Sequence, residues 1–126
     1  MATTERRGIK QLYCAMIWSW QGLRAAFRFE ASFRLEVYVA VVVVPLGLWL
    51  GQGPLAKVLL AGTPLLLLST ELLNSAIEAI VDKVSPEFSE MAGRAKDMGS
   101  AAVFMVLVLT GLTWVLLVGP LLWERL

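Results

Sequence analysis

Two glutamates interrupt a stretch of the chain that is otherwise apolar enough to cross a membrane. Glu71 and Glu78 lie between residues 65 and 82, where leucine and isoleucine predominate. An ionised carboxylate in hydrocarbon costs several kcal/mol, so acids inside a span usually face a bundle interior and carry function. Their spacing of seven residues returns to nearly the same face of an α-helix, and Asn74 and Asp82 fall within the same arc. The sequence therefore predicts a helix with one polar face, the polar ladder of Glu71, Asn74, Glu78 and Asp82.

The composition indicates a small integral membrane protein. Of the 126 residues, 58% are apolar and 17% are charged, whereas a soluble domain has about 45–50% apolar residues. The net charge of +1 gives no reason to expect a nucleic-acid partner. The chain has no histidine and a single cysteine, Cys14, which excludes an intrachain disulfide and a cysteine cluster for zinc.

Three apolar segments predict an all-α membrane protein with three transmembrane helices, at about 29–50, 55–81 and 98–123, since a span needs about 20 residues. Residues 51–54 read as a tight turn, and the polar residues 82–97 read as a loop. We expect a single integral membrane domain over 1–126.

The segment before the first span has the pattern of an amphipathic helix, at about residues 8–28. Its apolar residues recur at intervals of three and four, which is typical of a helix lying on the membrane surface. These residues are Ile9, Leu12, Tyr13, Met16, Trp20, Leu23 and Phe27.

The distribution of basic residues predicts the orientation of the spans. Nine of the eleven Lys and Arg residues lie in the N-terminal segment or in the predicted second loop, and the other two are Lys57 and Arg125. Because cytoplasmic segments carry the excess of Lys and Arg, we expect the N-terminus and residues 82–97 to be cytoplasmic. Glu78 then lies nearer the cytoplasmic surface than Glu71.

The residues alone leave several functions open. Lys96 precedes the residues that open the predicted third span, and positive charge beside a helix N-terminus suits a phosphate group. Neighbouring carboxylates could hold Mg²⁺, and Glu30 could point toward Glu78 if the first helix is unbroken. However, the chain has neither of the glycine-rich nucleotide-binding motifs. A polar seam that joins helices, a proton or cation path, and a catalytic site all remain possible.

Three runs resemble the prokaryotic diacylglycerol kinase family. They are residues 71–82 (ELLNSAIEAIVD), residues 93–102 (GRAKDMGSAA) and residues 20–36 (WQGLRAAFRFEASFRLE), and the similarity covers nearly the whole chain. The resemblance implies a multi-pass kinase of the bacterial inner (cytoplasmic) membrane that transfers the γ-phosphoryl group of ATP to the hydroxyl of diacylglycerol. It also implies Mg²⁺ as cofactor, a homotrimer with shared active sites, and a duty in phospholipid recycling.

The resemblance also implies roles for individual residues. Glu71 matches the catalytic base, Lys96 the lysine that stabilises the transferring phosphoryl group, and Asn74 a residue that orients Glu71. Glu30 and Glu78 match the carboxylates that hold Mg²⁺. The other ATP-side positions are Gln11, Trp18, Glu87, Phe88, Ser89 and Asp97, and the lipid-side positions are Trp20, Arg24, Arg34, Glu36, Trp49, Lys57, Ser100 and Trp114.

The chain departs from the family pattern at three nucleotide-side positions. Gln11 stands where an arginine is usual, Trp18 where a tyrosine is usual, and Ser89 where a histidine is usual. Lys10 or Arg7 could take over the contact of that arginine. Relatives that phosphorylate undecaprenol would share the same catalytic residues, so this lipid is an alternative substrate. A proton- or cation-coupled transporter built on the polar ladder is the non-enzymatic alternative.

Overall fold

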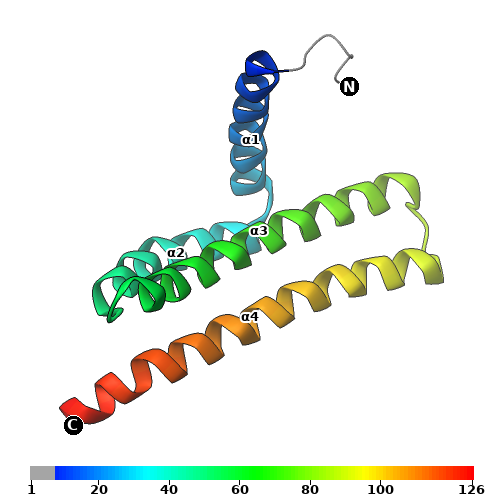
Figure 1. Ribbon diagram of the computed structural model, residues 1–126. Helices are drawn as coiled ribbons and strands as arrows, with labels where there is room; N and C mark the ends of the chain where they lie inside the picture. Colours follow the sequence, from blue (N-terminus) through cyan, green and yellow to red (C-terminus); the bar gives the residue numbers. More distant parts are fainter. Residues whose placement is uncertain (1–7) are drawn as a thin grey trace.

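The computed structural model describes residues 8–126, and all of the regular secondary structure in that range is helical. It contains α1 (Ile9–Phe29), α2 (Ala31–Leu50), α3 (Pro54–Val84) and α4 (Glu90–Arg125) (Figure 1). Residues 1–7, which include Arg6 and Arg7 of the orientation argument, lie outside the described part.

Three of these helices are long and apolar enough to cross a membrane, as the sequence predicts. They are α2 with 20 residues, α3 with 31 and α4 with 36. At about 1.5 Å per residue, α3 is roughly 46 Å long and exceeds the hydrocarbon thickness of about 30 Å. The polar end of α3 can therefore reach beyond the hydrocarbon region.

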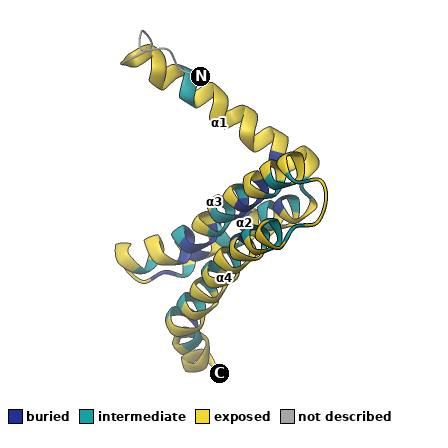
Figure 2. Ribbon diagram, turned by 90° about the vertical axis from the view of Figure 1, so that its right-hand side faces the viewer, coloured by how far each residue is buried: buried dark blue, intermediate teal, exposed yellow. Residues whose placement is uncertain are grey.

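The helix α3 lies at the centre of the bundle. It runs beside both α2 and α4, while α1 leaves the bundle at a steep angle (Figure 1). The helix α3 has more buried residues than any other helix, and α1 is exposed along nearly its whole length (Figure 2). The predicted helix at the N-terminus is therefore present, and its position on a membrane surface stays a prediction.

A single residue, Glu30, separates α1 from α2. Its backbone is extended, with φ −111° and ψ 107°. The guanidinium Nη1 of Arg34 donates hydrogen bonds to the carbonyl oxygens of Phe27 and Arg28, at 2.9 and 2.8 Å. These oxygens lack helical partners because α1 ends there, so Arg34 caps α1. It thereby stabilises the bend at Glu30 between α1 and α2, here called the elbow. Gly22 lies inside α1, so this glycine does not interrupt the helix.

The connection between α2 and α3 is the predicted tight turn. Gly53 has φ 88°, a conformation that glycine adopts at no steric cost. Pro54 opens α3 at the first helical position, where its missing N–H and fixed φ are suited to a helix start.

The connection between α3 and α4 is shorter than predicted, because α3 continues to Val84 and α4 begins at Glu90. The Oγ of Ser89 accepts a hydrogen bond from the backbone N–H of Ala92 at 3.1 Å, which makes Ser89 an N-cap. The polar residues that follow are mostly good helix formers, so they extend α4. The prediction that Lys96 lies beside free backbone N–H groups at a helix start is therefore wrong.

Candidate functional site

The polar ladder lies on the inner side of α3, and two of its members are deeply buried. Glu71 is 6% exposed and Asn74 is 8% exposed, although both are in a segment long enough to span a membrane. Glu78, two turns further on, is half-buried, and Asp82 is exposed. The ladder thus runs from the bundle interior toward the α3–α4 connection.

Glu71 accepts a hydrogen bond from a residue of α2. The Oγ of Ser32 donates to Oε1 of Glu71 at 2.8 Å. Asn74, which the family resemblance predicts to orient Glu71, instead donates from Nδ2 to Oε1 of Glu78 at 3.4 Å. The sequence analysis assigned no role to Ser32. The available signal was its spacing of four residues from Glu36, which places two polar groups on one face of α2.

The oxygen of the Asn74 side chain is held against α4. Oδ1 is buried and has no hydrogen-bond partner in residues 8–126. The nearest part of α4 is Gly99, where an added Cβ would collide with that oxygen. Gly99 therefore lets α4 approach the ladder closely, because its missing side chain leaves room for Asn74.

Lys96 brings positive charge to the outer end of the ladder. Its Nζ forms a salt bridge with Oδ1 of Asp82 at 2.5 Å, and both side chains are solvent-accessible. Lys96 lies in the second turn of α4 and Asp97 follows it, exposed. The other predicted ATP-side residues near this end are Glu87 and Phe88, which are exposed, and the N-cap Ser89. Ser100, which is predicted for the lipid side, is also exposed here.

The two predicted magnesium ligands come from different elements. Glu30 lies at the elbow and lines a cavity of about 700 Å³ together with Ser75 and Ala79 of α3. Ala79 follows Glu78 directly in the sequence. The Glu30 side chain makes no capping hydrogen bond to α2. Residues 8–126 contain no group of three or more His, Cys, Asp or Glu placed to hold a metal. Two carboxylates still fit Mg²⁺, which commonly takes one or two carboxylates together with substrate phosphate oxygens.

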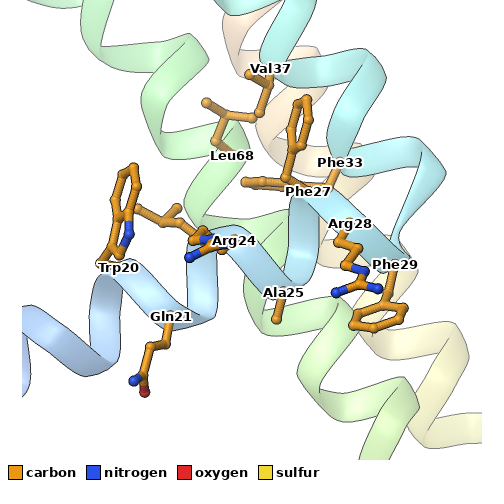
Figure 3. A pocket seen from close by; sticks show the side chains of 11 residues that line it. Trp20, Gln21, Arg24, Ala25, Phe27, Arg28, Phe29, Phe33, Val37 and Leu68 are labelled. Atoms are coloured by element: carbon orange, nitrogen blue, oxygen red, sulfur yellow. The ribbon is translucent and has the colours of Figure 1, made fainter.

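The predicted residues of α1 are divided between a cavity and open surface. Trp20 and Arg24 line a cavity of about 760 Å³ at the junction of α1, α2 and α3, with Phe33 and Leu68 on its wall (Figure 3). Gln11 and Trp18 are exposed on α1, and neither lines this cavity.

Two predicted lipid-side residues, Glu36 and Trp114, meet in a third cavity of about 390 Å³ between α2, α3 and α4. Oε2 of Glu36 is buried there without a hydrogen-bond partner among the described residues. Trp114 also has a structural role, because its Nε1 donates to the carbonyl oxygen of Leu60 at 3.1 Å.

Trp49 and Lys57 lie at the far end of the bundle. Trp49 lines a small cavity of about 230 Å³ near the α2–α3 turn, and Lys57 is exposed in the first turn of α3. Fourteen residues of helix separate Lys57 from Glu71, which is about 21 Å at about 1.5 Å per residue. Within one chain, Trp49 and Lys57 are therefore remote from the polar ladder. Arg34, another predicted lipid-side residue, forms hydrogen bonds to the carbonyl oxygens at the end of α1.

Comparison with known proteins identifies the family. The sequence model of the prokaryotic diacylglycerol kinase family matches residues 17–118. The diacylglycerol kinase of Escherichia coli K12 is 43% identical over 110 residues, which are 87% of this chain and 90% of that protein. The diacylglycerol kinase of Pseudomonas aeruginosa is 45% identical over 107 residues, 85% of this chain and 87% of that protein. The Haemophilus influenzae diacylglycerol kinase is 41% identical over 107 residues, 85% of this chain and 91% of that protein.

The match extends from the second half of α1 to near the end of α4, and so includes the elbow, the whole polar ladder and Lys96. A buried carboxylate on α3, a lysine at the outer end of the polar ladder and three apolar helices therefore occur in a chain whose relatives are lipid kinases. The chain belongs to the prokaryotic diacylglycerol kinase family.

Proposed function

We propose that the protein is an ATP-dependent kinase that phosphorylates the hydroxyl of 1,2-diacylglycerol and releases phosphatidic acid and ADP. In this reaction the lipid oxygen forms a bond to the γ-phosphorus, and the bond from that phosphorus to the ADP oxygen breaks. The lipid proton passes to an enzyme base. The observation that carries the proposal is the buried carboxylate of Glu71 on a membrane-spanning helix.

Glu71 is the proposed base. A base must lie within hydrogen-bond reach of the proton that it removes, so in this proposal the hydroxyl of the lipid enters the bundle to meet the carboxylate of Glu71. The hydrogen bond from the hydroxyl of Ser32 holds Oε1 of this carboxylate in place.

Lys96 is the proposed group that stabilises the transferring phosphoryl charge. Catalysis of phosphoryl transfer consists mainly of positioning and of neutralising charge on the phosphoryl oxygens. The salt bridge to Asp82 holds the Lys96 ammonium beside the ladder. A phosphate group would compete with Asp82 for this ammonium.

Mg²⁺ with ATP would be held by Glu30 and Glu78, and it would neutralise charge on the phosphate oxygens. Asn74 donates to Glu78 and so orients one of these two carboxylates. Because Glu30 lies between α1 and α2 and Glu78 lies on α3, the metal would connect the α1–α2 junction to α3.

We further propose a homotrimer in the bacterial inner membrane, with the N-terminus and the α3–α4 connection on the cytoplasmic side and a duty in phospholipid recycling. Three helices per chain leave large apolar faces exposed, among them Leu73 and Ile80 on α3, which partner subunits or lipid would cover. ATP would approach from the cytoplasm, where the ladder ends at Asp82.

A transporter would need polar groups along the whole path. In α4, the hydroxyl of Thr110 donates to the carbonyl of Val106 within its own helix, at 2.8 Å, and is thus engaged. The charged groups cluster around the α3–α4 end of the bundle, which favours a site at one surface over a through-path.

The test is phosphate transfer from γ-labelled ATP in mixed micelles with Mg²⁺, with dioleoylglycerol and undecaprenol offered in parallel. Labelled phosphatidic acid that disappears in Glu71→Gln, with assembly and helicity unchanged, is the expected result. Product from undecaprenol alone would keep the reaction and change the substrate. No product from either lipid with a folded protein would overturn the proposal.

A further inference from the structure

The hydroxyl of Ser32 on α2 donates a hydrogen bond to the proposed base. Its Oγ lies 2.8 Å from Oε1 of Glu71, and the two residues are 39 positions apart in sequence. Glu71 is nearly inaccessible, whereas Ser32 has an exposed surface. Ser32 therefore stands between the buried carboxylate and the outside of the bundle.

The position of Ser32 follows from the elbow. Because Glu30 is extended, α2 begins at Ala31 and Ser32 lies in its first turn. Arg34 holds the end of α1 against the start of α2 through the carbonyls of Phe27 and Arg28. Serine in the first turn of a helix often bonds to a local backbone group, but here the hydroxyl reaches across to α3.

The start of α2 also favours negative charge at this place. The first turn of a helix carries unpaired N–H groups and the positive end of the helix dipole, which stabilise a nearby anion within about one turn. The carboxylate of Glu71 lies beside this turn, as its bond to Ser32 shows. The hydroxyl of Ser32 and the first turn of α2 therefore both lie against this carboxylate.

We propose that Ser32 is a positioning residue for the Glu71 base: its hydroxyl fixes one carboxylate oxygen and leaves the other directed to the lipid hydroxyl. This role rests on the proposed kinase function. Ser32 transfers no proton and touches no phosphate in this proposal. Its effect should be on the rate of the chemical step and not on the binding of ATP or lipid.

The test compares kcat and KM of Ser32→Ala and Ser32→Thr with the unmodified protein in the mixed-micelle assay. Loss of a hydrogen bond to a charged group is expected to lower kcat about tenfold in Ser32→Ala, with KM for ATP and for dioleoylglycerol within about twofold. Ser32→Thr keeps a hydroxyl and should restore most of the rate.

Thr70→Val is the matched control, because it removes a hydroxyl that is adjacent to Glu71 in sequence but donates to the carbonyl of Leu66 in its own helix. It should leave kcat within about twofold. A second measurement uses Glu71→Asp, whose shorter side chain withdraws the carboxylate from Ser32. Adding Ser32→Ala to that variant should cause much less than the tenfold loss, since coupled residues are not additive.

An unchanged kcat in Ser32→Ala, or an equal loss in the Glu71→Asp background, would overturn the positioning role. Loss of thermal stability that parallels the loss of rate in both Ser32 variants would reduce Ser32 to a packing residue and also overturn it. An unmodified protein inactive on both lipids would overturn the proposed function itself, and with it this role. An active protein insensitive to Ser32→Ala would overturn the role alone.

Discussion

The indole N–H of Trp114 on α4 donates to a carbonyl oxygen of α3 that has no backbone donor because residue 64 is proline. In a regular helix the carbonyl oxygen of Leu60 would accept from the backbone N–H of residue 64, but proline has none. Nε1 of Trp114 donates to this oxygen at 3.1 Å. Leu60 is fully buried, and Gly47 of α2 packs against its backbone. One carbonyl thus joins three helices at the centre of the bundle.

Replacing Trp114 by Phe should therefore destabilise the protein by about 1–2 kcal/mol, because the carbonyl of Leu60 is left without a donor in an apolar interior. Pro64→Ala restores a backbone N–H at position 64. In that background Trp114→Phe should cost clearly less. Equilibrium unfolding in detergent micelles measures all four proteins of this cycle, and equal losses in both backgrounds would contradict the assignment.

Gly99→Ala should loosen the contact between α3 and α4. Its new Cβ would meet the side chain oxygen of Asn74, and overpacking of this kind costs about 1–3 kcal/mol. Because Asn74 also donates to Glu78, kinase activity should fall as well. Gly119→Ala is the control, since a Cβ there meets nothing within 4 Å. Similar unfolding midpoints for the two variants would argue against the close approach.

Removing the charge of Lys96 should lower kcat much more than removing the charge of its salt-bridge partner Asp82. Asp82→Asn is expected to change the free energy of unfolding by less than about 1 kcal/mol, because both partners are solvent-accessible. Lys96→Met should lower kcat by about a hundredfold or more if its charge stabilises the transferring phosphoryl group. A comparable loss of kcat in Asp82→Asn would place Asp82 in the catalytic machinery instead.

Arg34→Met should destabilise the elbow more than it weakens the binding of the lipid substrate. Without the guanidinium, the carbonyls of Phe27 and Arg28 lose their donor, so backbone amides in the last turn of α1 should exchange hydrogen faster. The KM for dioleoylglycerol should stay within about twofold. Arg94→Met, which removes an equal charge from α4, controls for electrostatics. A raised KM with unchanged exchange would support the lipid contact that the family resemblance implies.

Chelation of Mg²⁺ should abolish phosphate transfer, and added Mg²⁺ should restore it. Glu30→Gln and Glu78→Gln should each raise the Mg²⁺ concentration for half-maximal rate by about tenfold or more, since each removes a carboxylate that suits the metal. Glu124→Gln, at the far end of α4, is the control. An unchanged Mg²⁺ requirement in either test variant would remove that residue from the proposed metal site.

The sequence predicted the features that depend on periodicity. The three long apolar helices, the N-terminal helix and the turn at Gly53 follow from local patterns, and the structure confirms them. The start of α4 was misplaced because charged residues suggested a loop, although most of them are good helix formers behind the N-cap Ser89.

The tertiary contacts of the site could not be predicted in the same way. Ser32 meets Glu71 across 39 residues and Trp114 meets Leu60 across 54, and neither pairing leaves a periodic signal in the chain. The polar ladder was visible because its members share one helix. Their partners depend on how α2 and α4 pack against α3, and therefore on the space that Gly47 and Gly99 leave open.

The elbow at Glu30 makes one residue both a joint and a proposed ligand. Rotation about the backbone of Glu30 would change the angle between α1 and the bundle, and the same rotation would displace the carboxylate of Glu30. If Glu30 holds the metal as proposed, metal affinity and the inclination of α1 are thermodynamically linked, so a lipid surface that holds α1 at one angle would also change the affinity of the proposed metal site. The reverse follows with equal strength, so binding of Mg²⁺ and nucleotide would reduce the range of angles that α1 explores.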